Sequence, residues 1–238
     1  MHKIMKDDIM ISAVIVSAGN STRMGGINKQ FLEINGMPVI AHSILAFQNS
    51  EHIDEIVIVT RESDIQDIQK IVEKYNFTKV SAIVPGGKTR QLSVYNGVVN
   101  TSKSSMLVAI HDGARPLVSD KVITETLKAA AMCGAAATGV KVKDTVKVVD
   151  DNNNIVDTAD REYMRFIQTP QAFRKSLYLS AVQNVDNSKD FTDDCMLIEA
   201  YGKTVKFVDG EYENIKITTP EDVELAESYL KRKGNINA

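Results

Sequence analysis

A short apolar run turns into a small, polar and basic loop within the stretch Val14-Ile15-Val16-Ser17-Ala18-Gly19-Asn20-Ser21-Thr22-Arg23-Met24-Gly25-Gly26, and Lys29-Gln30 follows just beyond it. The apolar run is typical of a buried strand. Glycines let the main chain approach an anion closely, while backbone N–H groups and the cations Arg23 and Lys29 attract it. Glycine and serine alone would fit an ordinary turn, but with the two cations the stretch predicts a phosphate-binding loop at the end of a buried strand.

Outward from this loop, runs rich in β-branched residues alternate with helix-length amphipathic segments. The expected strands are Ser12–Ser17, Glu55–Thr60, Val80–Val84, Met106–His111 and Ala135–Val140. The expected helices are Pro38–Gln48, Asp64–Tyr75, Thr89–Val98 and Ser119–Cys133. This alternation predicts an α/β fold with a mostly parallel sheet flanked by helices, in which ligands bind outside the carboxyl ends of the strands.

The alternation ends at residues 141–161, where β-branched segments flank Asp150-Asp151-Asn152-Asn153-Asn154. This pattern predicts a protruding β-hairpin arm. An isolated hairpin is only marginally stable in water, so the arm needs a surface to pack against. A second subunit is one candidate, and the arm's own chain is the other.

Two helix starts are expected in the last part of the chain. Thr192 is a candidate cap for a helix that runs through Leu197 to Tyr201. Thr219, with Pro220 after it and Asp222 three residues on, predicts the start of a terminal helix that reaches about Lys231. Lys216 is therefore expected at the end of a short strand just before that helix.

The composition limits the classes of protein that fit. The chain has 238 residues, 43% hydrophobic and 25% charged, which suits one sizeable domain over residues 1–238, although two small domains are also compatible with this length. Its net charge of −3 gives no reason to expect a nucleic-acid surface. Met1 to Met10 contains no signal-peptide or membrane-spanning pattern. We therefore expect a cytoplasmic protein with no nucleic-acid or membrane partner, whose two cysteines, Cys133 and Cys195, are reduced and structural.

A second glycine-containing loop, Pro85-Gly86-Gly87-Lys88-Thr89-Arg90-Gln91, follows an expected strand. Its Gly87-Lys88-Thr89 matches the end of a Walker A motif. However, Ala82 stands where that motif requires its first glycine, and strand-forming residues with a rigid proline fill the rest. A true P-loop is therefore disfavoured.

The segment His111-Asp112-Gly113-Ala114-Arg115-Pro116 ends another strand. Asp112 could bind a sugar hydroxyl or a metal, but it could also pair with Arg115 or cap the helix near Ser119. A histidine at the end of a buried strand is more often a hydrogen-bonded structural residue than a catalytic one. Further polar groups occur at Asp160-Arg161, Gln168-Thr169-Pro170-Gln171 and Thr192-Asp193-Asp194, and singly each fits a solvated side chain or a helix cap.

Together and in order, these segments resemble the cytidylyltransferases that make 4-diphosphocytidyl-2-C-methyl-D-erythritol from CTP and 2-C-methyl-D-erythritol 4-phosphate in the non-mevalonate isoprenoid pathway. The resemblance extends from about Ile11 to Leu230. It is carried by Ala18-Gly19 with Ser21-Thr22-Arg23-Met24-Gly25, Lys29-Gln30-Phe31-Leu32, Gly86-Gly87 with Arg90-Gln91 and Ser93-Val94, His111 to Pro116, Asp144-Thr145, Asp160-Arg161, Gln168 to Gln171, Thr192-Asp193-Asp194 and Asn214-Ile215-Lys216-Ile217-Thr218-Thr219-Pro220-Glu221-Asp222.

The resemblance implies a Rossmann-like, GT-A-like nucleotidyltransferase that moves CMP from CTP to a sugar-alcohol phosphate and releases pyrophosphate. It also implies Mg²⁺ as the cofactor, without identifying protein ligands for the metal. It implies a homodimer in which Thr145 and Arg161 reach the partner's site on the arm. The expected catalytic residues are Arg23 and Lys29, which match residues that stabilise the transition state, and Arg161 and Lys216, which match residues that position the methylerythritol phosphate. The expected nucleotide-binding residues are Ser17, Ala18, Gly19, Gly87, Ser93, Asp112 and Gly113. The expected substrate-binding residues are Asp112, Arg115, Thr145, Arg161, Thr169, Thr192 and Lys216.

The chemistry of such a transfer agrees with the scarcity of candidate bases in this chain. The nucleophile is a phosphate monoester with a second pKa of about 6, so it is already largely dianionic at neutral pH. The protein's task is then positioning and charge stabilisation rather than proton removal.

The chain departs from the family pattern at three positions. Asn28 precedes the lysine where proline is usual, Lys88 stands where some members have an acid, and Gly113 stands where many have alanine. Three other functions are alternatives for this sequence: a ribitol-5-phosphate cytidylyltransferase, a nucleotide-binding regulatory module without turnover, and a P-loop phosphotransferase that depends on Lys88.

Overall fold

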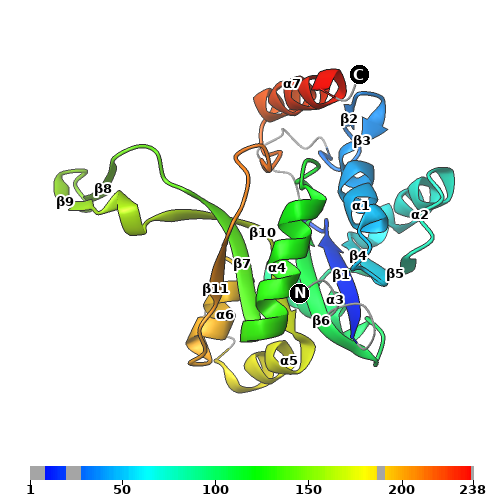
Figure 1. The fold of residues 1–238 in the computed structure, drawn as a ribbon, viewed down its shortest axis with the longest axis horizontal. Helices are drawn as coiled ribbons and strands as arrows, with labels where there is room; N and C mark the ends of the chain where they lie inside the picture. Colours follow the sequence, from blue (N-terminus) through cyan, green and yellow to red (C-terminus); the bar gives the residue numbers. More distant parts are fainter. Residues whose placement is uncertain (1–8, 20–27, 187–190, 237–238) are drawn as a thin grey trace.

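A seven-stranded sheet forms the centre of the molecule (Figure 1). The computed structural model describes residues 9–19, 28–186 and 191–236. The strand order is β11-β7-β10-β6-β1-β4-β5, and β10 runs antiparallel to both of its neighbours while the other pairs are parallel. The mostly parallel sheet is therefore confirmed. Its strands are β1 (Met10–Val16), β4 (Glu55–Thr60), β5 (Val80–Pro85), β6 (Ser105–Asp112), β7 (Ala135–Lys141), β10 (Arg165–Arg174) and β11 (Lys206–Asp209).

Helices cover both faces of this sheet, which is why strands such as β1 and β4 are apolar almost throughout. Alternate side chains of β1 point to opposite faces: Ile11, Ala13 and Ile15 pack with α1, α2 and α4, whereas Val14 packs with α3, α5 and α6. The helices are α1 (Val39–Asn49), α2 (Ile65–Lys74), α3 (Arg90–Val99), α4 (Asp120–Cys133), α5 (Lys175–Asn184), α6 (Asp194–Ala200) and α7 (Pro220–Ile236).

The five strands and four helices expected over residues 12–140 are all present, with ends shifted by one or two residues. One helix differs at its start, because Glu62–Asp64 forms a 3₁₀ turn before α2. Sequence reasoning missed β10, β11, α5 and the small hairpin of β2 (Glu33–Ile34) and β3 (Met37–Pro38). β10 was hidden by Pro170 and its flanking polar residues, and its register with β7 shifts between Ile167 and Gln171.

Two expectations about the last part of the chain are wrong, and so is the expected structural role of Cys133. Lys216 lies in a segment with no strand, held instead by a hydrogen bond from Ile217 N to Ala114 O at 2.8 Å. The cap of α6 is Asp193, whose carboxylate accepts from Met196 N at 3.0 Å, and not Thr192. Of the two free cysteines, Cys195 is buried but Cys133 is exposed, so only the first fits a structural role.

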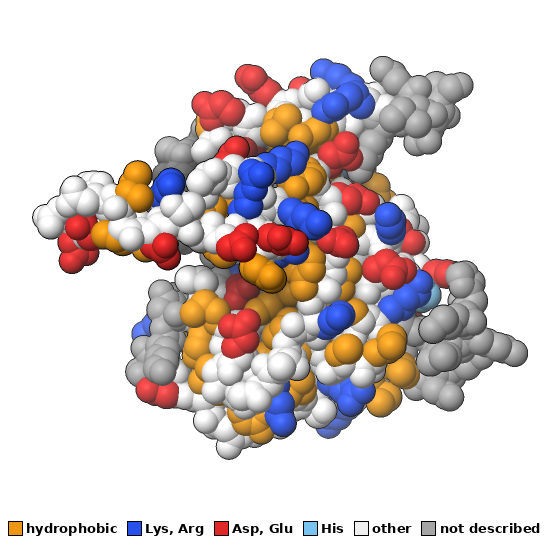
Figure 2. Space-filling model, turned by 60° about the vertical axis from the view of Figure 1, so that its left-hand side comes forward, with side chains coloured by type: hydrophobic (Ala, Val, Ile, Leu, Met, Phe, Trp, Pro, Cys, Tyr) orange, Lys and Arg blue, Asp and Glu red, His pale blue; other side chains and the backbone are white. Residues whose placement is uncertain are grey.

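The β-hairpin arm is confirmed. β8 (Val146–Val149) and β9 (Ile155–Ala159) pair antiparallel and project from the body of the molecule (Figures 1 and 2). Asn153 makes the turn with a φ of 63°, and the Asp150 carboxylate accepts from the backbone N–H of Asn152 and Asn154. Apolar side chains on both arm strands are left between 45% and 64% exposed: Val148, Val149, Ile155 and Val156.

In the described residues, no helix has both the length and the apolar character needed to cross a bilayer.

Candidate active site

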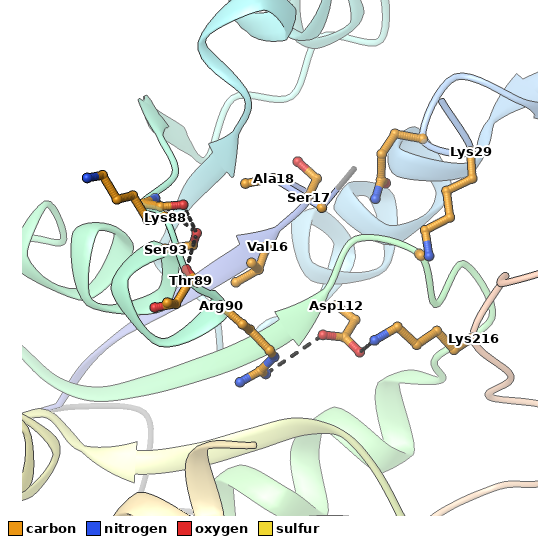
Figure 3. A pocket seen from close by; sticks show the side chains of 14 residues that line it. Val16, Ser17, Ala18, Lys29, Lys88, Thr89, Arg90, Ser93, Asp112 and Lys216 are labelled. Atoms are coloured by element: carbon orange, nitrogen blue, oxygen red, sulfur yellow. Dashed lines mark hydrogen bonds and ion pairs between the residues drawn. The ribbon is translucent and has the colours of Figure 1, made fainter. Parts of the chain in front are cut away.

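A pocket of about 430 Å³ opens at the carboxyl ends of β1 and β6 and beside the start of α3 (Figure 3). This is the edge of a parallel sheet at which ligands bind in α/β folds. Eight of its lining residues are ones that the sequence predicts as site residues: Ser17, Ala18, Gly19, Lys29, Gly87, Ser93, Asp112 and Lys216. The others are Val16, Gln30, Lys88, Thr89, Arg90 and Ala114.

The wall between β5 and α3 is closely packed. Gly87 N donates to Ser93 Oγ at 3.0 Å, and Ser93 Oγ donates to Thr89 O at 2.9 Å. A Cβ at Gly86 would overlap that of Ala18, and one at Gly87 would overlap that of Leu92. Gly86 therefore allows the loop to lie directly against the residues after β1, and Gly87 allows it to lie against the start of α3.

This wall is not a P-loop. β5 continues to Pro85 and pairs with β4 through Thr60 and Pro85. The positions that a Walker A motif needs as flexible loop are therefore strand. Lys88 lies on the rim of the pocket, as Figure 3 shows, and points away from Asp112.

Three cations surround the carboxylate of Asp112 at the centre of the site. Lys216 Nζ lies 2.8 Å from Oδ2, Arg115 Nε lies 3.6 Å from Oδ2, and Arg90 Nη2 lies 3.8 Å from Oδ1. Burial by itself would raise the pKa of Asp112, but these cations outweigh it and hold the pKa well below its usual range. Asp112 is thus ionised at neutral pH, and the cations leave an excess of positive charge around it.

The capping alternative for Asp112 is wrong, because Ser119 caps α4 itself by accepting from Val122 N. The alternative in which Asp112 pairs with Arg115 holds, although that contact is looser than the one with Lys216.

Arg90 is an important residue to which the sequence analysis gave no role. Its Nη1 lies 2.8 Å from Asp194 Oδ2, and Asp194 also accepts from Tyr178 Oη at 3.4 Å. Burial raises the pKa of Asp194, and the charge of Arg90 opposes that rise. Arg90 is thereby held between a buried carboxylate on α6 and the Asp112 carboxylate. The sequence shows only an arginine at the start of an expected helix, because its partner is far away along the chain.

His111 is structural, as expected. Its ring is buried against Phe47, with Nε2 3.1 Å from Arg115 O and Nδ1 3.0 Å from Thr169 Oγ1. Thr169 Oγ1 also accepts from Asp112 N at 3.0 Å, so the hydroxyl donates its own proton to Nδ1, and Nε2 carries the proton that Arg115 O accepts. Burial lowers the pKa of His111 to about 4. A neutral His111 therefore holds the Arg115 carbonyl directly and the Asp112 N–H through Thr169.

Lys29 extends across the pocket from the other side. Its Nζ donates to Ile217 O at 2.9 Å, next to Lys216 in the chain. The second predicted loop cation, Arg23, lies outside the described residues.

A smaller hollow of about 260 Å³ adjoins the first, with Arg90, Asp112 and Lys216 in both walls. It brings together three more predicted substrate-binding residues, Arg115, Thr169 and Thr192. The remaining members of its lining are Ile167, Gln168, Gln171 and Asp193, none of which was predicted as a site residue.

Three predicted site residues within the described part of the chain do not line either hollow. Gly113 lies just behind the pocket, where a Cβ would come 2.6 Å from Ile40 Cδ1 and 3.2 Å from Gln30 Oε1. Thr145 is exposed in the arm, and Arg161 lies at its base with Nη1 donating to Lys143 O at 2.9 Å. Of the described residues that line the two hollows, none comes from the arm.

The site offers little to a metal on its own. Among the described residues, no group of three or more histidine, cysteine or acidic side chains is placed to hold a metal ion. Asp112 is the one acidic side chain in the described lining of the larger pocket.

Comparison with known proteins was made against families, sequences and solved structures. The family model for 2-C-methyl-D-erythritol 4-phosphate cytidylyltransferase matches residues 11–232. The enzyme of that name from Caldanaerobacter subterraneus subsp. tengcongensis is 49% identical over 225 residues, which cover 93% of this chain and 99% of the relative. The one from Clostridium botulinum (strain ATCC 19397 / Type A) is 45% identical, with 93% and 97% covered.

Solved structures of similarly named proteins share the fold. The crystal structure of 4-diphosphocytidyl-2C-methyl-D-erythritol synthase from Anaerococcus prevotii superposes with a TM-score of 0.85 at 37% identity, covering 95% of this chain and 98% of that one. The 2-C-methyl-D-erythritol 4-phosphate cytidylyltransferase from Thermus thermophilus superposes with a TM-score of 0.77 at 29% identity, covering 94% and 100%.

Proposed function

This chain belongs to the family of 2-C-methyl-D-erythritol 4-phosphate cytidylyltransferases, and we propose that the two adjoining hollows around Asp112 are where it carries out the family's reaction. It is a nucleotidyltransferase of the isoprenoid pathway that transfers CMP from CTP to 2-C-methyl-D-erythritol 4-phosphate. The observation that supports this location most strongly is the presence of three cations, Lys216, Arg90 and Arg115, within 3.8 Å of Asp112, because they outnumber Asp112 and the second carboxylate that Arg90 binds, Asp194. Such a site attracts two phosphorylated substrates.

In the transfer, an oxygen of the substrate's phosphate attacks the α-phosphorus of CTP. The new P–O bond forms as the bond from the α-phosphorus to the bridging oxygen breaks, and pyrophosphate leaves with both electrons of that bond. No proton has to be removed, because the attacking phosphate is a dianion at neutral pH. The protein therefore contributes by holding the two substrates in line and by stabilising the charge that develops on the phosphate oxygens.

We assign that stabilisation to Lys29 and Arg23, with Lys29 as the described member of the pair. Its Nζ donates to the Ile217 carbonyl, and its side chain borders the larger pocket. A triphosphate in that pocket would offer Lys29 ionised acceptors, which form strong charge-assisted hydrogen bonds. Removal of one such cation costs on the order of 10²-fold in rate.

The larger pocket suits the nucleotide and the smaller one suits the sugar phosphate. Ser17, Ala18, Gly19, Gly87 and Ser93, which all line the larger pocket, are assigned to the cytosine base. Asp112, which borders both hollows, is assigned to the ribose together with Gly113 behind it, and Arg115, Thr192 and Lys216 are assigned to the second substrate. Thr169 supports this wall through His111 and the Asp112 backbone, since its hydroxyl is already engaged there.

We propose Mg²⁺ as the cofactor, bound mainly through the triphosphate, because Lys216 already engages the Asp112 carboxylate and no described acidic cluster is placed to hold a metal. Substrate phosphates are common ligands of this ion. When bound, it neutralises phosphate charge and so assists the departure of pyrophosphate.

We further propose that the enzyme is a homodimer whose sites are completed by the partner's arm. Thr145 and Arg161 are assigned to the second substrate but lie on the exposed arm, outside both hollows of their own chain. Val148, Val149, Ile155 and Val156 on the arm are 45% to 64% exposed, which is costly unless another surface covers them. We also place the reaction in the cytoplasm, because both cysteines are free and free thiols are typical of reducing compartments.

Pyrophosphate release tests the proposal directly. With Mg²⁺ and CTP we expect release with 2-C-methyl-D-erythritol 4-phosphate, and little with ribitol 5-phosphate or with other nucleoside triphosphates. Release only with ribitol 5-phosphate would contradict the substrate. CTP binding without pyrophosphate release from any mixture would indicate a regulatory module. A Lys88→Ala variant is expected to keep full activity, because β5 occupies the positions that a P-loop would need.

A further inference from the structure

Asn28, the residue before Lys29, uses both ends of its side chain. Its Nδ2 donates to Asp64 Oδ2 at 2.8 Å, and its Oδ1 accepts from Gln30 N at 3.2 Å. The second of these bonds closes a turn over Lys29. The first reaches a different part of the fold, because Asp64 belongs to the 3₁₀ turn between β4 and α2.

Asp64 is a fixed acceptor. It is only 6% exposed, and Arg61 binds it through Nε to Oδ2 at 2.8 Å and through Nη2 to Oδ1 at 3.1 Å. Ser63 Oγ donates to Oδ1 as well. A carboxylate held by a two-pronged arginine is among the most rigid polar anchors in proteins. Asn28 is thus tied to the edge of the sheet rather than to solvent.

Lys29 is held between two anchored neighbours. On one side Asn28 is bound to Asp64, and on the other Gln30 is 4% exposed and its carbonyl accepts from Ile40 N at 3.1 Å. A lysine has a long, flexible side chain, so its reach across a pocket is reproducible only when its backbone is fixed. The hydrogen bonds of Asn28 supply that restraint on the side that enters from the phosphate-binding loop.

We propose that Asn28 is a positioning residue for Lys29, acting through the Arg61–Asp64 ion pair. This inference rests on the proposed role of Lys29 in stabilising the transition state. Asn28 stands where proline is usual in the family, and its side-chain hydrogen bonds restrain the backbone next to Lys29.

The test compares Asn28→Asp with the paired variant Asn28→Asp/Asp64→Asn. Asn28→Asp keeps the acceptor for Gln30 N but replaces the donor with a carboxylate oxygen next to Asp64. We expect kcat to fall about 10-fold or more while KM for CTP changes less than about threefold, because misplacing Lys29 affects the transition state more than binding. The paired variant returns one carboxylate and one amide to the cluster, so kcat should recover to within about threefold of wild type.

Two further variants separate the possible failures. Asp67→Asn, on the same helix start but in an exposed pair with Lys70, should leave both constants unchanged. Lys29→Ala is measured alongside: if it leaves kcat intact, the proposed role of Lys29 fails. If Lys29→Ala lowers kcat but Asn28→Asp does not, the positioning inference alone is overturned. The inference is also overturned if the paired variant has a kcat as low as that of Asn28→Asp while the two variants have the same thermal unfolding midpoint.

Discussion

Lys216 makes the shortest contact that Asp112 has with a cation in the described part of the chain, at 2.8 Å, because Arg115 and Arg90 lie at 3.6 and 3.8 Å. Lys216 also borders both hollows, so it faces nucleotide and second substrate together. For Lys216→Ala we expect kcat to fall on the order of 10²-fold and KM for 2-C-methyl-D-erythritol 4-phosphate to rise. Steady-state kinetics with each substrate varied measures both, and Lys128→Ala, in an exposed pair with Glu125, is the control. An unchanged KM for the sugar phosphate contradicts the assignment of Lys216.

His111 makes stability depend on pH. Burial lowers the pKa of His111 from 6.5 to about 4. Below about pH 6.5, His111 is therefore protonated in the unfolded chain but stays neutral in the native protein. Stability should therefore fall as pH is lowered from about 6.5 to about 4, by at most about 1.4 kcal/mol per pH unit from this group. Urea unfolding of wild type and His111→Asn at pH 5, 7 and 8 measures it. The difference in unfolding free energy between the two proteins should shrink from pH 7 to pH 5 and stay constant from 7 to 8. A constant difference throughout would show that His111 is not buried as a neutral ring.

The single residues differ in how far the sequence could predict them. Lys29, Asp112 and Lys216 stand in motifs that carry their own signal, and the structure brings all three to one pocket. Arg90 could not be assigned, because its restraint comes from Asp194, whose partner choice depends on how α6 packs beside α3. Asn28 appeared only as a departure from a pattern, since its bonding partner Asp64 lies 36 residues further along the chain.

At the scale of elements, α3 lies so close to the sheet that only glycine fits at its contact point. A Cβ at Gly97 would overlap Val14 Cγ1 and would come 2.7 Å from Val59 Cγ2. Gly97→Ala should therefore destabilise the protein by roughly 1–3 kcal/mol through overpacking, although alanine favours helix by about 1 kcal/mol. Urea unfolding measures this, with Val99→Ala on the exposed side of the same helix expected to stay within about 0.5 kcal/mol of wild type. A stabilised Gly97→Ala would mean that α3 moves freely against β1.

The elements that the sequence predicts well are those with a local signal. β-branched runs and amphipathic segments identify β1, β4, β5, β6, β7 and α1 to α4, and the polar turn between two apolar runs identifies the arm. β10 and the segment around Lys216 lack such a signal. Pro170, Gln168 and Gln171 weaken the strand signal of β10, and its place in the sheet depends on both neighbouring strands. Asn214, fully buried and bonded to Thr169 O, shows that the Lys216 segment is held by side chains rather than by a strand ladder.

At the scale of the whole molecule, one chain provides both hollows but leaves two assigned residues on an exposed arm. A homodimer would account for the position of these two residues, because the partner's arm would bring its Thr145 and Arg161 to the smaller hollow. It would also cover the exposed apolar side chains of the arm strands. Sequence patterns alone could not decide this, since a hairpin signal says nothing about the surface on which the hairpin packs.

Mixing two inactive variants tests that arrangement. Lys29→Ala damages the body of a site and Arg161→Ala damages the arm. In a mixed dimer, the site with the Arg161→Ala body and the Lys29→Ala arm therefore has no defect, whereas the other site has both. After free exchange of equal amounts, about half of the dimers are mixed and half of their sites are intact, so activity should recover to about a quarter of wild type.

A mixture of Arg161→Ala with the Lys29→Ala/Arg161→Ala double variant has no intact combination and should stay inactive. Recovery in the first mixture but not in the second can arise only if each site draws on two chains. Failure of the first mixture, with subunit exchange verified by mass, means that each site is built within one.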